Sequence, residues 1–127
     1  MKEIKPITNK GASDKFNGDV YATVIIDGSA PSCLHTWNVH FAPGARTAWH
    51  SHKYGQYLHI VEGTALIQER GGQVQEFHAG QTAYTAPGIE HWHGASDDSF
   101  MVHLAIWQGD EDGGATTWKE HVANSSS

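Results

Sequence analysis

The chain has 127 residues, of which 39% are hydrophobic, and its 14 acidic and 8 basic side chains give a formal charge of −6 at pH 7. That length fits one domain over residues 1–127, and the negative net charge argues against binding to nucleic-acid phosphates, which a positive field drives. With a single cysteine and no apolar run of membrane-spanning length, the sequence predicts a cytoplasmic protein that binds neither nucleic acid nor membranes.

Short segments rich in Val, Ile, Thr, Tyr and Trp, separated by turns that contain glycine, predict strands rather than helices. Residues 1–15 are polar and are expected to form a flexible arm or an edge strand. The expected strands are Val20–Ile26, His35–Phe41, Thr47–His52, Gln56–Val61, Thr64–Arg70, Val74–Phe77, Thr82–Thr85 and Phe100–Trp107. A helical turn is expected only at Thr117–Val122, and Asn124–Ser127 is expected to be a disordered tail. Many short strands without helices between them predict an antiparallel sandwich or barrel.

Two histidines on one face of a strand form the first candidate metal-binding group. His50 and His52 are two residues apart, so their side chains point to the same side of an extended chain. We expect a tight turn at Lys53–Gly55 to reverse the chain and bring Gln56, on the next strand, opposite this pair. A lone His-x-His pair is as often a surface or hydrogen-bonded pair as a metal site.

A second group follows the turn predicted at Pro87-Gly88. His91 and His93 again share a face, and His91 could complete a set of three histidines and one glutamine. Neutral imidazole nitrogens with one amide oxygen suit a borderline divalent metal and leave coordination positions for water or a substrate.

The spacing of the first group resembles the first signature motif of the cupin superfamily. It reads Gly44, five residues, His50-Ser51-His52, three residues, Gln56, six residues and Gly63. Gln56 stands where most members of the superfamily carry glutamate, which changes the charge of the site.

The segment from Gly80 through Pro87-Gly88 to His91 resembles the second cupin motif, with one extra residue before Pro87 and no asparagine after His91. The resemblance implies an all-β, antiparallel jelly-roll barrel of six to eight strands that contains one divalent transition metal per chain. It also implies a homodimer or higher homo-oligomer. The implied metal ligands are His50, His52, Gln56 and His91.

Four further residues have alternative interpretations. His103 lies in the almost wholly apolar strand Phe100–Trp107 and is either a packed core group or a general base beside the metal. His93 shares a face with His91 and is expected in the cavity wall, where it orients that ligand or contacts a substrate. Trp37 and Trp107 either narrow the cavity around the metal or pack under the neighbouring sheet.

Several runs are similar to small bacterial cupins, a group that includes manganese-dependent hydroxynitrile lyases: Pro43–His50, Gly55-Gln56, His91–Gly94, His103–Ile106 and Trp118–Val122. This similarity implies reversible cleavage of a small-molecule cyanohydrin into a carbonyl compound and cyanide, with His103 or His93 transferring the proton. Manganese is the expected metal, with iron, nickel or zinc as alternatives. An iron(II)-dependent dioxygenase and a small-ligand-binding protein without turnover are alternative functions.

Overall fold

Alternation of buried and exposed side chains along short strands produces the whole architecture of residues 1–123, the part of the chain that the computed structural model describes. The tail expected at Asn124–Ser127 lies outside the described residues. Twelve strands and no helix occur in the described part: β1 (Ile7–Lys10), β2 (Phe16–Asn17), β3 (Val20–Asp27), β4 (Leu34–Phe41), β5 (Arg46–Thr47), β6 (His50–His52), β7 (Gln56–Glu69), β8 (Gln75–His78), β9 (Thr82–Thr85), β10 (His91–Ala95), β11 (Met101–Gln108) and β12 (Thr116–Trp118). None of the described residues belongs to a helix long and apolar enough to cross a membrane.

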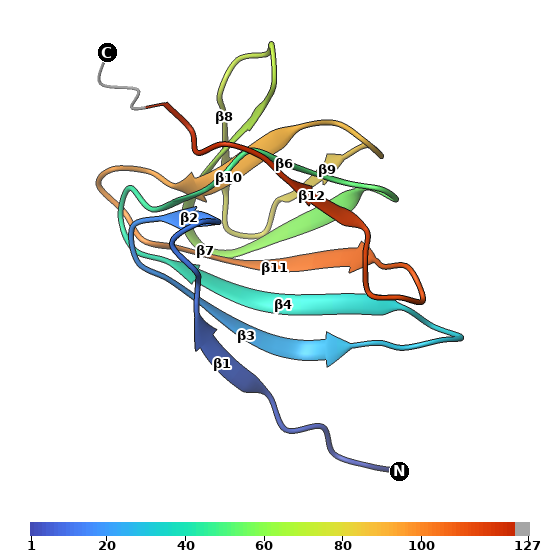
Figure 1. Cartoon of the computed structure of the whole chain (residues 1–127). Helices are drawn as coiled ribbons and strands as arrows, with labels where there is room; N and C mark the ends of the chain where they lie inside the picture. The colour runs from blue at the N-terminus through green and yellow to red at the C-terminus, as the bar shows by residue number, and fades with distance from the viewer. Residues whose placement is uncertain (124–127) are drawn as a thin grey trace.

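All strand pairs among these residues are antiparallel, and the main sheet runs in the order β1-β3-β4-β11-β7-β10-β5-β2. Figure 1 shows β1, β3, β4 and β11 side by side in one layer, with β6, β10 and β12 in the layer that faces it. The long strand β7 joins the layers, because its first part pairs with β11 and β9 and its second part with β10 and β8. The all-β, antiparallel jelly-roll prediction is therefore confirmed.

Gly63 lies inside β7, where the sequence predicted a break between two strands. Its φ angle of +78° is accessible to glycine at little cost, and a Cβ at this position would overlap the carbonyl group of Phe100. The register of β7 against β11 shifts between Val102 and His103. The strand thus bends through a glycine and an irregular pairing, and it does not end there.

The C-terminal segment differs from its prediction as well. The helical turn expected at Thr117–Val122 is wrong, because Thr116–Trp118 forms β12 and pairs with β6. Threonine and tryptophan favour strands, and the register Thr116↔His52 and Trp118↔His50 places this segment beside the histidine pair. At the other end of the chain, β1 pairs with β3, so part of the N-terminal segment is an edge strand.

The inward face of the large layer carries the core. Residues of odd number in β4 and β11 point into the barrel, as alternation predicts, and Val39, Phe41 and Met101 are buried. With Val20 and Ile60 they belong to one apolar cluster. Trp37 packs against this cluster and the Phe41 ring contacts His93 and His103, so the candidate site borders the apolar core.

Candidate metal centre

Five buried histidines from three strands gather inside the barrel, and each is at most 5% exposed. The β6 residue His50 lies directly opposite His91 of β10, with ring centroids 4.4 Å apart. The His50 ring is also 5.1 Å from the rings of His52 and His93. His103 enters from β11 and lies 4.8 Å from His93. Because these rings are buried away from water, their hydrogen bonds to other protein groups determine which ring nitrogens carry a proton and which keep a lone pair.

Two of the rings are held so that one nitrogen faces the centre of the cluster. His50 Nδ1 lies 2.9 Å from the carbonyl oxygen of Ala48, and His91 Nδ1 lies 3.0 Å from that of Ile89. A carbonyl oxygen only accepts hydrogen bonds, so each Nδ1 carries the proton and each Nε2 keeps a lone pair. Backbone anchoring of this kind is typical of histidines that bind a metal through Nε2.

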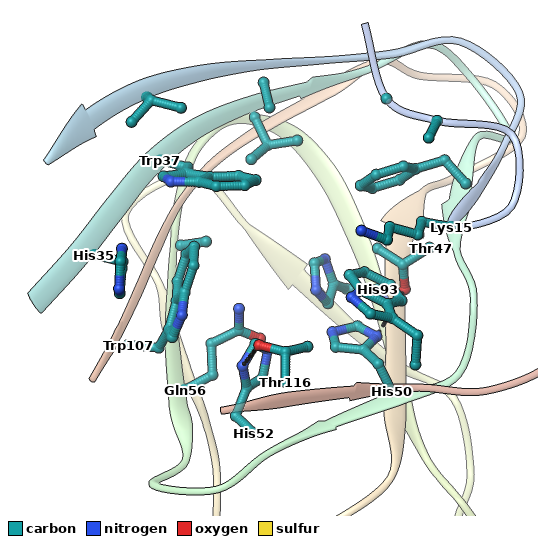
Figure 2. A pocket seen from close by; sticks show the side chains of 18 of the residues that line it. Lys15, His35, Trp37, Thr47, His50, His52, Gln56, His93, Trp107 and Thr116 are labelled. Carbon is teal, nitrogen blue, oxygen red and sulfur yellow. Dashed lines mark hydrogen bonds between the residues drawn. The ribbon is translucent and has the colours of Figure 1, made fainter. Parts of the chain in front are cut away.

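Gln56 completes an arrangement of acceptors. Its Oε1 atom lies 3.1 Å from His91 Nε2, which is itself an acceptor once Nδ1 carries the proton. Two lone pairs directed at each other are unfavourable, and a cation between them removes that conflict. Figure 2 shows Gln56 beside His52, whose Nδ1 contacts Thr116 Oγ1 at 3.1 Å and whose Nε2 is buried without a hydrogen-bond partner among the described residues. These nitrogen and oxygen donors fit a borderline divalent metal.

Three of the buried histidines form a partly different candidate set. The ligand atoms of His50, His91 and His93 all lie within 4.8 Å of one another, so these three buried histidines could hold a metal ion. His93 is also engaged by His103, whose Nε2 lies 2.9 Å from His93 Nδ1. The two sets share His50 and His91.

The expected route by which Gln56 reaches the histidine pair is wrong. The sequence predicted that a hairpin would pair the strand of His50 and His52 with the strand that begins at Gln56. Within the described residues β6 pairs with β10 and β12, whereas the start of β7 pairs with β11 and β9. The side chains of His50, His52 and Gln56 still line one cavity.

Burial sets the protonation state of the cluster. It lowers the pKa of His52 to about 3, with a further contribution from His91, and it also lowers the pKa values of His50 and His91. All three rings are therefore neutral near pH 7, which is the form that binds a metal.

His93 and His103 form a hydrogen-bonded pair in the cavity wall. Burial lowers the pKa of His103 to about 4, and burial together with the neighbouring His103 lowers that of His93 well below its usual value. The outer nitrogens, His93 Nε2 and His103 Nδ1, are buried without hydrogen-bond partners in the described part of the chain. In either tautomer one outer nitrogen carries a proton and the other a lone pair, so the pair can accept a proton at one end and release one at the other.

A cavity of about 400 Å³ adjoins these histidines. Figure 2 shows Trp37, Trp107 and His35 on one side, His50 and His93 on the other, and Gln56 between them. The rings of Trp37 and Trp107 meet edge to face at 5.2 Å, and His35 stacks on Trp107 at 5.2 Å. Both tryptophans therefore narrow the cavity, which decides between the two placements that the sequence left open.

The chain termini add cavity residues that the sequence analysis missed. Trp118 stacks on His50 with centroids 4.5 Å apart, and Thr116 contacts His52. Alternation in Thr116–Trp118 is the signal that could have indicated a strand there. Lys15, in the turn between β1 and β2, also lines the cavity, and nothing in its local sequence distinguishes it from a solvent-exposed lysine.

The chain is similar to known proteins over almost its whole length. Residues 37–107 match the cupin domain family. An (R)-mandelonitrile lyase of Granulicella tundricola is 42% identical over 117 residues, which cover 92% of this chain and 88% of that protein. The crystal structure of a cupin-like protein of Thermotoga maritima, 34% identical, superposes with a TM-score of 0.85 over 96% of this chain and 92% of its own. A cupin 2 conserved barrel domain protein of Rhodopseudomonas palustris, 12% identical, shares the fold with a TM-score of 0.72 over 89% of this chain and 77% of its own. Fold, motif spacing and these similarities together show that the chain belongs to the cupin family.

Proposed function

We propose that this cupin is a metal-dependent lyase of the hydroxynitrile lyase type, which reversibly cleaves a small-molecule cyanohydrin into a carbonyl compound and cyanide. The observation that carries the proposal is the His93–His103 pair in the wall of the same cavity as the histidine and glutamine donors. The reaction needs an acceptor and a donor of protons beside a site that stabilises negative charge on oxygen. The similarity to a mandelonitrile lyase at 42% identity supports this choice of reaction.

The proposed ligands are His50, His52, Gln56 and His91. Their hydrogen bonds leave lone pairs free for coordination, and an amide in place of a carboxylate leaves the charge of the metal less compensated. When bound, a divalent ion would supply Lewis acidity that polarises the hydroxyl group of the substrate. Mn²⁺ is the proposed ion, because the chain resembles manganese-dependent hydroxynitrile lyases and because the amide oxygen of Gln56 suits Mn²⁺.

The chain's own groups account for the proton transfers. In the direction of cleavage, the hydroxyl proton passes to the free lone pair of the His93–His103 pair, and the oxygen forms the carbonyl group. The carbon–nitrile bond breaks, and its electron pair leaves on cyanide. The pair then gives a proton to cyanide, so the products are a carbonyl compound and hydrogen cyanide, and no electron donor or oxidant takes part. Trp37 and Trp107 enclose the carbonyl substituent and exclude water.

The proposal also includes a cytoplasmic location and a homodimeric assembly. The lone Cys33 is buried and free, which agrees with a reducing compartment. Analytical ultracentrifugation of the purified chain measures the assembly directly.

The test uses protein purified without chelators or a histidine tag and loaded with Mn²⁺. Anaerobic release of cyanide from mandelonitrile and from a smaller aliphatic cyanohydrin is measured, together with metal content. We expect about one metal ion per chain, and loss of both metal and activity in the double variant His50→Ala, His52→Ala. The matched control is His78→Ala, an exposed histidine of β8, which should keep both.

Two outcomes contradict the proposal. The first is an absence of cyanide release when Mn²⁺, Fe²⁺, Ni²⁺ and Zn²⁺ are each loaded in turn. The second is consumption of oxygen with Fe²⁺ and a substrate, which would establish the alternative dioxygenase. Retention of about one metal ion by the double variant would refute the ligand assignment.

A further inference from the structure

Lys15 directs a positive charge at the cavity. Its side chain extends from the turn between β1 and β2, and Figure 2 shows it on the side of the cavity that carries His93. The ammonium nitrogen lies 5.6 Å from the centroid of the Trp118 ring, a cation–π contact. Among residues 1–123, Lys15 makes no ion pair.

Lys10 also lines the cavity and lies 3.4 Å from the carboxylate of Asp19. The carboxylate of Asp27, which is largely exposed, lies 2.8 Å from the His35 ring. Within the described part of the chain, Lys15 is thus the lysine of the cavity that has no carboxylate partner. An anion in the cavity would be stabilised by this ammonium group, because Coulomb attraction is stronger where water is partly excluded.

The backbone holds Lys15 close to the metal centre. Its carbonyl oxygen accepts a hydrogen bond of 2.7 Å from the N–H of Ala48, and Ala48 also anchors His50. Trp118, which contacts the Lys15 ammonium group, stacks on His50. The ammonium group therefore stands one aromatic ring away from a proposed metal ligand.

The cavity consequently has two chemically different ends. Trp37, Trp107 and His35 form an aromatic end, and Lys15 supplies a cationic end on the side of His50, with Gln56 and His52 between the two ends. A ligand that fits this cavity carries an apolar substituent for the aromatic end and an oxygen atom that reaches the metal centre. It also carries a group that is anionic, or becomes anionic in the reaction, for the cationic end.

We propose that Lys15 forms the anion subsite of this cavity and, on the basis of the proposed function, binds cyanide as it leaves the cyanohydrin. The electron pair of the breaking carbon–nitrile bond moves onto cyanide, and the fixed positive charge of Lys15 stabilises it until the histidine pair protonates it. In the reverse direction the same charge binds cyanide before it attacks the carbonyl carbon.

The test measures the affinity of the metal-loaded protein for thiocyanate, a linear anion that carries a nitrile group, by isothermal titration calorimetry. Lys15→Met keeps the apolar stem and removes the charge, and we expect it to weaken thiocyanate binding roughly 10- to 100-fold, the size of one charge-assisted contact. Lys15→Arg keeps the charge and should bind within a few-fold of the wild type. Lys119→Met changes the net charge of the protein equally but lies outside the cavity, so it should leave the affinity unchanged.

A second measurement separates this proposal from the proposed function. In the direction of cyanohydrin synthesis, Lys15→Met should raise the KM for cyanide by a similar factor and leave the KM for the carbonyl compound unchanged. Thiocyanate binding equal to the wild type in Lys15→Met would overturn the anion subsite, whatever the protein catalyses. Weaker thiocyanate binding with an unchanged KM for cyanide would overturn the assignment of cyanide. If no cyanohydrin is cleaved at all, the thiocyanate affinities still decide the role of Lys15.

Discussion

Replacing His103 by glutamine separates proton transfer from packing. His103 is fully buried, its Nε2 lies 2.9 Å from His93 Nδ1, and its ring packs 5.2 Å from that of Phe41. Alanine at this position would leave a cavity and an unpaired His93 nitrogen, at a cost of about 1–3 kcal/mol in the free energy of unfolding. Glutamine fills most of the space and its amide N–H can still donate to His93, but it cannot carry a proton between groups.

We therefore expect the melting temperature of His103→Gln to lie closer to that of the wild type than the melting temperature of His103→Ala does. The kcat of His103→Gln should fall roughly 10²- to 10⁴-fold at full metal loading. The assay is the initial rate of cyanide release per bound metal ion, combined with thermal unfolding of the same sample. His59→Gln is the matched control, because His59 lies on β7, bonds Thr82 and lies outside the cavity. A His103→Gln variant that keeps its metal and more than half of the wild-type kcat would refute a role for His103 in proton transfer.

Three further predictions follow from charge, burial and backbone geometry. Gln56→Glu should bind the metal more tightly and turn over more slowly per metal ion, since the added negative charge weakens Lewis acidity; competition with a chelator and single-substrate kinetics measure both. The metal-free protein should lose stability as the pH falls below 6.5, because His103, with its pKa lowered from 6.5 to about 4, stays neutral in the folded state while the unfolded chain binds the proton. Protonation of His103 alone should lower the free energy of unfolding by about 3 kcal/mol between pH 6.5 and pH 4. Urea unfolding at a series of pH values measures this loss. Gly63→Ala should lower the melting temperature far more than Gly71→Ala, because both residues have positive φ but only at Gly63 would the new Cβ overlap the Phe100 carbonyl group; equal effects would contradict the close approach.

Local sequence patterns predict the parts of this fold that depend on local geometry. The alternation of apolar residues in β4 and β11 placed Trp37, Val39 and Phe41 on one face, and their strand has them on the inner face of the barrel. The His-x-His and Gln spacing likewise identified residues that do line one cavity. A strand fixes which side chains share a face, so these statements need no knowledge of its neighbours.

Pairing between distant segments is what the sequence could not provide. The hairpin expected around Lys53–Gly55 was predicted from the neighbouring turn residues alone. In the structure β6 pairs with β10 and β12, which lie much later in the chain. Gly63 looked like a strand end because glycine commonly ends strands, and here it bends a strand that keeps its pairing with β11. In both places tertiary pairing outweighs the local signal.

Residues outside the family match contribute part of the cavity. Residues 37–107, which match the cupin domain family, contain all the proposed ligands, the His93–His103 pair and both cavity tryptophans. The groups that orient or charge the site, namely Thr116, Trp118 and Lys15, come from outside that range. A change of charge at Lys15 alters the cavity without replacing a proposed ligand or a core residue, whereas a change at His50 removes a proposed metal donor. We therefore expect Lys15, Thr116 and Trp118 to modulate what the cavity binds, together with Trp37 and Trp107 from within the family match.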